Sequence, residues 1–211
     1  MENWLQLDLR MVLRNRLICV TCQNKFQRII GFQCMACGRK MQDESICDEC
    51  LRWQNASSVA VNHVALYEYN DMMRKFFQCY KFMGGYHFAE IFKKEMMLHI
   101  RQLKPDVIVP IPVHECTFNE RGFNQVEGLL VGYTQLLKKA EANKAQSLKT
   151  RAERLNVENP FTVNLDLNVQ NNVKICIVDD VYTTGATLHH AYNSLYTAGY
   201  TNVCSLTLAR A

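Results

Sequence analysis

The chain has 211 residues, of which 48% are hydrophobic and 21% charged, and its formal net charge is +4. This composition is ordinary for a soluble globular protein, and no stretch reaches the about 20 uninterrupted apolar residues of a membrane helix. We therefore expect a soluble chain without membrane insertion, with one main domain and one minor domain. The modest net charge does not by itself identify a nucleic-acid-binding protein.

The first residues, MENWLQLDLRMVLRNRLICV, contain charges among the apolar side chains and no small-residue cleavage site. This pattern is not typical of a signal peptide, so we expect a cytoplasmic protein. Residues 138–154 carry six basic side chains against two acidic ones, a surplus that can meet phosphate groups.

Ten cysteines in a reducing compartment indicate metal binding or buried thiols rather than disulfides. Six of them form three Cys-x-x-Cys pairs before residue 51. In the pairs CMAC and CDEC, two tight turns can present four thiolates to one tetrahedral Zn²⁺ from opposite sides. We expect a closed, structural zinc site formed by Cys34, Cys37, Cys47 and Cys50.

The first pair, Cys19 and Cys22, is open to three interpretations. It joins the same zinc, binds metal together with a partner protein, or binds no metal. The four scattered cysteines are predicted to be small core residues because their surroundings are apolar. They are Cys79, Cys116, Cys176 and Cys204.

The chain divides near residue 55, where small polar residues follow the last cysteine pair. Residues 1–55 lack long hydrophobic periodicity, so metal must substitute for a core there, whereas residues 56–211 alternate strands and helices. Expected strands are residues 59–69, 106–113, 173–178 and 203–209, and expected helices are residues 71–82, 86–103, 123–140 and 186–198. Residues 144–159 are polar and predicted to be mobile. This alternation predicts an α/β fold with a parallel sheet flanked by helices.

The segment VDDVYTTGAT, residues 178–187, places two carboxylates at a predicted strand end and a hydroxyl-rich turn before a helix. The free N–H groups and dipole of the helix N-terminus favour an anion, and Gly185 lets the backbone approach it closely. Two carboxylates would repel a phosphate. We therefore expect Asp179 and Asp180 to face vicinal ribose hydroxyls or a shared Mg²⁺.

The string IVDDVYTTGAT resembles the signature with which type I phosphoribosyltransferases bind phosphoribosyl pyrophosphate, or PRPP. The resemblance implies that the acidic pair contacts ribose hydroxyls and that the turn holds the 5-phosphate. The matching residues are Asp179, Asp180, Thr183, Thr184, Gly185 and Thr187, with Ala186 inside the same turn. Tyr182 departs from the pattern, in which an aliphatic residue is usual.

Three further segments resemble the ComF family of competence-associated proteins with a phosphoribosyltransferase domain. They are YKFMGG, VPIPVHECTFNERGFNQ and AQSLKTRAERLNVENPF. The resemblance covers nearly the whole chain. It implies a zinc finger in residues 1–55, a type I phosphoribosyltransferase-like domain in residues 56–211, and a role in natural transformation. It also implies a DNA-translocating, ComFA-like ATPase or helicase as partner, and contact with single-stranded DNA.

Displacement of pyrophosphate from PRPP passes through an oxocarbenium-like state. By the resemblance, Asp179 and Asp180 stabilise the ribose, while Mg²⁺, Lys81 and Arg121 neutralise the departing pyrophosphate. The catalytic residues are then Asp179, Asp180 and Arg121, and Lys81 belongs to the PRPP site. The backbone of the turn PIPVH is the expected pyrophosphate loop.

Alternatives stay open for several of these side chains. Arg121 is either a pyrophosphate ligand or a surface arginine beside a helix, and His114 is either a general acid or base or a turn residue. Asn124 and Gln125 either orient substrate or cap a helix. The basic loop within residues 144–159 either closes over PRPP or is only solvated.

Two classes of function compete at this point. The first is a transferase-type domain acting in DNA uptake. The second is a non-catalytic module that senses PRPP or binds single-stranded DNA. Nucleobase salvage is a further enzymatic alternative, but the sequence offers no identifiable base-reading residues.

Overall fold

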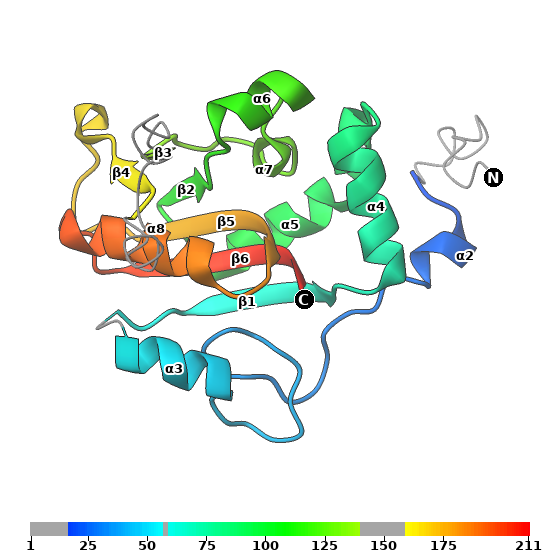
Figure 1. Ribbon diagram of the computed structural model, residues 1–211, viewed down its shortest axis with the longest axis horizontal. Coiled ribbons are helices and arrows are strands. Elements are labelled where there is room, and N and C mark those ends of the chain that lie inside the picture. The colour runs from blue at the N-terminus through cyan, green and yellow to red at the C-terminus, as the bar shows by residue number, and fades with distance from the viewer. Residues whose placement is uncertain (1–16, 57–58, 140–158) are drawn as a thin grey trace, which may run out of the picture.

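The structure is a computed structural model that describes residues 17–56, 59–139 and 159–211 (Figure 1). Its centre is a four-stranded, all-parallel sheet in the order β1-β6-β5-β2. The strands are β1 (His63–Glu68), β2 (Val107–Pro110), β5 (Ile175–Tyr182) and β6 (Val203–Arg210). The predicted α/β class with a parallel sheet flanked by helices is therefore confirmed.

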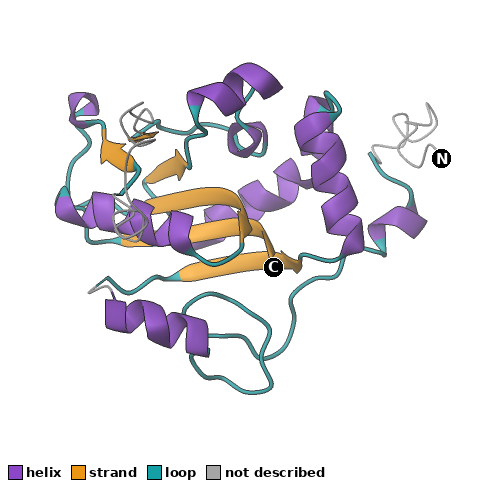
Figure 2. Ribbon diagram, viewed as in Figure 1, coloured by secondary structure: helices purple, strands orange, loops and turns teal. Residues whose placement is uncertain are grey.

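Helices cover both faces of this sheet (Figures 1 and 2). Helices α4 (Asp71–Phe82), α5 (Glu90–Leu103) and α7 (Gln125–Gly128) share a core with Cys176 and Val178 of β5. Helix α8 (Ala186–Thr197) shares a second core with Ile175 and Ile177. Successive side chains of a strand point to opposite faces, so β5 supplies both cores in alternation.

The helices that flank the sheet begin and end at local signals in the sequence. The Asn70 side chain accepts a hydrogen bond of 2.9 Å from the Met73 N–H and caps α4, as an N-terminal Asn commonly does. Gly84, with φ of 65°, ends this helix region, and the 3-10 turn η1 (Tyr86–Ala89) leads into α5. Helix α4 has the predicted bounds, and α8 differs from its prediction by one residue.

The predicted helix over residues 123–140 is wrong. The chain forms α6 (Glu115–Arg121) and the single turn α7, and then β3 (Leu137–Lys139) pairs antiparallel with β4 (Phe161–Val163). Gly128 packs so tightly that a Cβ there would lie 2.2 Å from the Tyr80 hydroxyl, and Gly132 has φ of 67°. These glycines break the apolar periodicity that suggested one continuous helix.

Three smaller expectations also change. Strand β1 begins at His63 rather than residue 59, and β5 continues to Tyr182, so the acidic pair lies within the strand instead of after it. Cys116 is exposed on α6, whereas the other three scattered cysteines are buried as predicted. The polar segment 144–159 lies, apart from its last residue, outside the described residues.

The cysteine-rich part contains α2 (Val20–Gln23) and α3 (Asp48–Ala56) joined by irregular loops (Figure 2). Part of it packs with the sheet: Ile29 N–H donates to the Leu66 carbonyl at 3.0 Å, and the Phe26 ring makes edge contacts with Phe76 and Phe92. The remaining element is a 3-10 turn, η3 (Leu165–Leu167). The domain boundary near residue 55 stays a prediction.

Candidate functional site

The acidic pair lies where the segments that follow two neighbouring strands go to opposite faces of the sheet. Strand β2 pairs with β5 only as far as Pro110 opposite Val178. From there the chain after β2 enters α6 and α7 on the α4 side, while the chain after β5 enters α8 on the other side. Such a switch point at the carboxyl ends of parallel strands is the usual ligand crevice of open α/β sheets.

Asp179 and Asp180 lie at this switch point, and both side chains are buried. Lys81, in the last turn of α4, places Nζ 2.5 Å from Asp180 Oδ2. The Asp180 N–H donates to Asp179 Oδ1 at 2.9 Å. Burial and the neighbouring Asp180 charge raise the pKa of Asp179 to about 8. The structure thus joins Lys81 to the acidic pair, and one of the two acids holds its proton near neutral pH.

Arg121 reaches the same region from the end of α6. Its Nη1 donates to Gln125 Oε1 at 2.9 Å, and its guanidinium lies 5.0 Å from the centre of the Phe82 ring. The Tyr80 hydroxyl donates to the Gln125 carbonyl at 2.6 Å. The C-terminal ends of α4 and α6 therefore converge beside the crevice, and Arg121 contacts these neighbours rather than the carboxylates.

His114 and Asn124 both have capping roles. His114 Nδ1 accepts from the Cys116 N–H at 3.2 Å, and Asn124 Oδ1 accepts from the Val126 N–H at 2.9 Å. His114 Nε2 and Arg121 Nε are nevertheless buried and have no hydrogen-bond partner within the described part of the chain. Because buried polar atoms are nearly always satisfied, these two atoms are candidates to contact a bound ligand.

The turn of residues 183–187 joins β5 to α8. Gly185 has φ of 82°, and a Cβ there would lie 2.2 Å from the Tyr182 hydroxyl, so this position requires glycine. Thr183, Thr184 and Thr187 are exposed. Exposed hydroxyls around free N–H groups at the N-terminus of a 12-residue helix are suited to a phosphate.

Two residues contact this turn that the sequence did not single out. Trp53 Nε1 donates to the Thr184 carbonyl at 2.9 Å, and Arg210 Nη1 donates to the Thr183 carbonyl at 2.8 Å. Arg210 also lies over the Tyr182 ring, 4.4 Å from its centre, which accounts for an aromatic residue at that position. Trp53 is far from the turn in the sequence, and no local sequence pattern predicts the contact.

The four predicted zinc ligands meet in one buried cluster. The Sγ atoms of Cys34, Cys37, Cys47 and Cys50 all lie within 4.8 Å of one another. A hydrogen bond from Cys50 lowers the pKa of Cys37 to about 4, and the Arg210 charge acts in the same direction. Four thiols at this spacing, one of them readily ionised, match the donor set of a closed tetrahedral zinc site.

Cys19 and Cys22 lie apart from this cluster, at the N-cap of α2 and within α2. Cys19 Sγ accepts from the Cys22 N–H at 3.4 Å and caps this short helix. Since the cluster already offers four ligands, sharing its zinc is not supported. The two remaining interpretations of this pair are metal binding with a partner protein and no metal.

Comparison with known proteins places the chain in a family. No family model matches it. It is 35% identical over 206 residues to the competence protein ComFC of Streptococcus pneumoniae, an alignment that covers 95% of this chain and 91% of that protein. It is 33% identical to ComFC of Bacillus subtilis, covering 92% of this chain and 84% of that protein. The chain belongs to the ComFC family of competence proteins.

A more distant relative is the competence protein F of Haemophilus influenzae, 24% identical over 214 residues. The ComFC relatives match this chain over the cysteine-rich part and the sheet alike. Among the described helices, none combines the length and apolar character that a bilayer crossing requires.

Proposed function

We propose that this ComFC family member binds PRPP with Mg²⁺ at the crevice between β2 and β5 and acts in DNA uptake during natural transformation. One observation carries the proposal. Strand β5 contains a buried acidic pair near its end, and the turn after it presents exposed hydroxyl groups at the N-terminus of α8. The proposed zinc finger lies within residues 1–55 and the PRPP-binding domain within residues 56–211.

In this proposal each group has a separate task. Asp179 and Asp180 accept hydrogen bonds from ribose hydroxyls, and the turn from Thr183 to Thr187 holds the 5-phosphate with its N–H groups and hydroxyls. When bound, Mg²⁺ neutralises the pyrophosphate. Arg121 and Lys81 add positive charge on the same side, so that a developing ribose cation and a departing anion are both stabilised if transfer occurs.

The contact between Lys81 and Asp180 bears on how PRPP would enter. Lys81 Nζ lies 2.5 Å from a buried carboxylate, so the ion pair fills the space beside Asp180. In the proposed complex the ribose diol takes over contact with Asp180, and the Lys81 ammonium turns to the pyrophosphate. An exchange of one partner for another keeps the buried charge paired throughout.

Titration calorimetry with PRPP and Mg²⁺ tests this proposal. Wild-type protein should bind, and the double variant Asp179→Asn/Asp180→Asn should lose binding. Asp71→Asn is the matched control because Asp71 is an exposed acid at the opposite end of α4 from Lys81. Absence of wild-type binding would refute the proposed PRPP site. If binding occurs, pyrophosphate release with candidate acceptors measures whether transfer follows.

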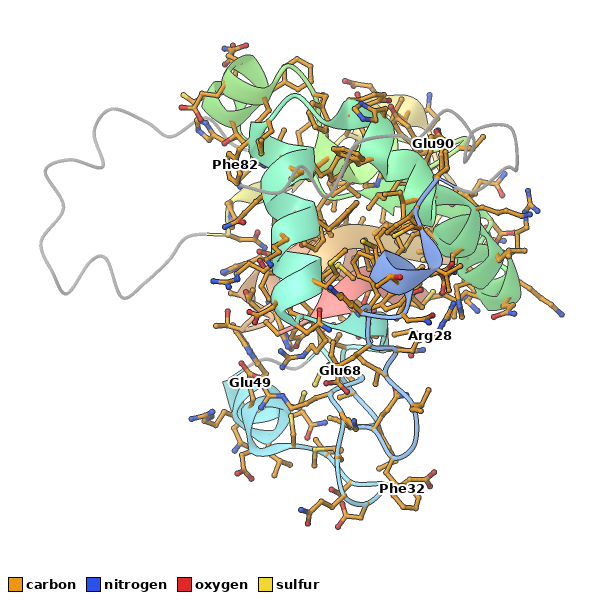
Figure 3. All side chains as sticks on the ribbon, turned by 90° about the vertical axis from the view of Figure 1, so that its right-hand side faces the viewer. Arg28, Phe32, Glu49, Glu68, Phe82 and Glu90 are labelled. Carbon is orange, nitrogen blue, oxygen red and sulfur yellow. The ribbon has the colours of Figure 1, made fainter. Side chains whose placement is uncertain are left out.

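We also propose that the finger docks the ComFA-like DNA-translocating ATPase. The supporting observation is the exposure of three apolar side chains within residues 30–35: Ile30 is 70% exposed, Phe32 54% (Figure 3) and Met35 65%. Large apolar side chains that are exposed to this extent in one short segment are suited to a protein interface. The variant Ile30→Ser/Phe32→Ser should lower transformation frequency and binding to the purified ATPase, while PRPP binding stays intact. Unchanged ATPase binding would exclude this surface.

A second candidate function is binding of single-stranded DNA beside the crevice. Exposed aromatic and apolar side chains occur at the end of α4, in η1 and on α6, with Phe82 at 70% (Figure 3), Met83 at 74%, Tyr86 at 53% and Phe118 at 46%. Bases stack on such side chains while nearby cations meet the phosphates. Fluorescence anisotropy with a labelled oligothymidine should show salt-sensitive binding that Phe82→Ala weakens. No binding at low salt would eliminate this function.

A further inference from the structure

Helix α3, which begins inside the third Cys-x-x-Cys pair, touches the proposed phosphate turn through Trp53. Its indole Nε1 donates to the Thr184 carbonyl at 2.9 Å. The indole ring also stacks on His189 of α8, with ring centres 4.1 Å apart and planes 11° apart. One side chain of the cysteine-rich region therefore holds both the turn and the first turns of the helix that it begins.

A second connection runs through the buried Arg210, the last residue of β6. Arg210 Nη1 donates to the Thr183 carbonyl at 2.8 Å, and Nη2 donates to Glu49 Oε2, also at 2.8 Å. Glu49 lies inside the pair CDEC, between two of the four clustered cysteines (Figure 3). Arg210 Nη2 is also 3.9 Å from Cys37 Sγ. The cysteine cluster and the turn thus share one guanidinium.

These contacts determine which backbone groups the turn presents outward. The carbonyls of Thr183 and Thr184 point to donors from Arg210 and Trp53, so they are engaged on the cysteine-rich side. The Thr183 and Thr184 side chains remain exposed. Removing α3 would take away the Trp53 donor and the Glu49 partner of a buried arginine, and a buried unpaired charge is unfavourable. The conformation of the turn consequently depends on α3 being in place.

We infer that Trp53 and the Glu49–Arg210 pair hold residues 183–187 in their anion-binding conformation, so that metal loading of the cysteine cluster and anion binding at the turn are coupled. The four cysteines fix the start of α3, and α3 carries both Glu49 and Trp53. Coupling between two sites is reciprocal, so a bound anion also stabilises the loaded cluster. Trp53 and Arg210 are positioning residues here. The identity of the anion as PRPP rests on the proposed function, whereas the control of the turn by α3 does not.

Hydrogen exchange on the full-length, zinc-loaded protein tests, without any ligand, whether Trp53 holds the turn in its conformation. The variant Trp53→Phe keeps an aromatic ring to stack on His189 and removes only the N–H donor. The His189 amide, which donates to the Gly185 carbonyl at 2.9 Å, and the amides that follow it in α8 should exchange about fivefold faster than in the wild type, as expected for one lost hydrogen bond. Unchanged exchange at these amides would overturn the inference.

Arg39→Gln is the matched control for this measurement. Arg39 Nη2 lies 2.5 Å from the same Glu49 oxygen, but Arg39 is partly exposed and its side chain is paired with Glu49 rather than the turn. Its loss should leave exchange at these α8 amides as in the wild type. The loaded protein is used throughout because a metal-free chain can lose the whole finger, which would not separate Trp53 from general unfolding.

Zinc transfer to 4-(2-pyridylazo)resorcinol tests the coupling itself. Saturating PRPP with Mg²⁺ should slow zinc release severalfold in the wild type and in Arg39→Gln, and have little effect in Trp53→Phe. Equal slowing in Trp53→Phe would overturn the part of Trp53 in the coupling, and no slowing in a wild type that binds PRPP would overturn the coupling as a whole, while the proposed function stands. A wild type that fails to bind PRPP by calorimetry refutes the proposed function, and the exchange experiment still decides the role of Trp53.

Discussion

The two halves of this protein are stabilised by different means. In residues 34–50 the buried hydrophobic positions are the four clustered cysteines, while Met35 is 65% exposed. The sheet instead has a core on each face, built from α4 and α5 on one side and α8 on the other. We expect a short segment that cannot bury enough apolar surface to depend on metal, whereas the sheet depends on packing. Changes to one part should therefore act mainly on that part and reach the other through the shared contacts of α3 and Arg210.

Loss of metal is the largest expected effect. Structural zinc in small peptide sites contributes about 10–16 kcal/mol of apparent binding free energy. Cys37→Ser should remove zinc and the exchange protection of residues 34–50, while strands β5 and β6 stay protected. Zinc should be bound at one ion per chain in the wild type and in the control Cys19→Ser. A ratio near two, or zinc loss in Cys19→Ser, would contradict the single four-cysteine site.

Truncation of the sheet core should give the converse result. Phe76 is 1% exposed and packs its ring against Phe92 and Tyr80. Phe76→Ala should lower the free energy of unfolding by about 3–5 kcal/mol, because it leaves a cavity in the α4 side of the core. Urea denaturation measures this loss. The zinc content of the folded variant should not change, and a parallel loss of zinc would show that the two halves fold as one unit.

Gly185→Ala should have a smaller effect, confined to the turn. A Cβ at this position lies 2.2 Å from the Tyr182 hydroxyl at φ of 82°, so overpacking should cost about 2 kcal/mol and displace the turn. Gly31→Ala is the matched control, since its φ is 83° and nothing lies within 4 Å of the added Cβ. Calorimetry should show loss of PRPP binding in the first variant only. Equal PRPP affinity in both would contradict the assigned role of the turn.

The smallest effect concerns pH at the acidic pair. The pKa of Asp179 is raised to about 8, so the folded protein binds a proton there that the unfolded chain releases at a lower pH. Its contribution to stability is present below the unfolded value of 3.8 and is lost as pH rises through about 8. The proposed PRPP binding needs the ionised form of Asp179. Affinity should therefore increase as pH rises towards about 8, by up to about tenfold per pH unit.

Calorimetry between pH 6.5 and 9, in buffers of different ionisation enthalpy, should detect the proton released on binding. Asp71→Asn should retain this dependence. Asp179→Asn should remove the Asp179 contribution and leave only that of the PRPP phosphate groups. An identical pH profile in Asp179→Asn and the wild type would show that another group titrates.

Local features of the sequence determined much of this protein. The helical spacing of residues 71–82 predicted α4 to the residue, because this periodicity acts within a few positions. The spacing of Cys34, Cys37, Cys47 and Cys50 predicted the cluster for the same reason. The string from Asp179 to Thr187 indicated a phosphosugar site, and that assignment stays a prediction.

Only the tertiary structure decided how these parts meet. The close approach of Gly128 to Tyr80 ended the helix predicted over residues 123–140, and pairing with β6 extended β5 past the acidic pair to Tyr182. The contact of Trp53 with Thr184 joins residues 131 positions apart. Such contacts leave no local pattern, because their partners become neighbours only when the sheet assembles.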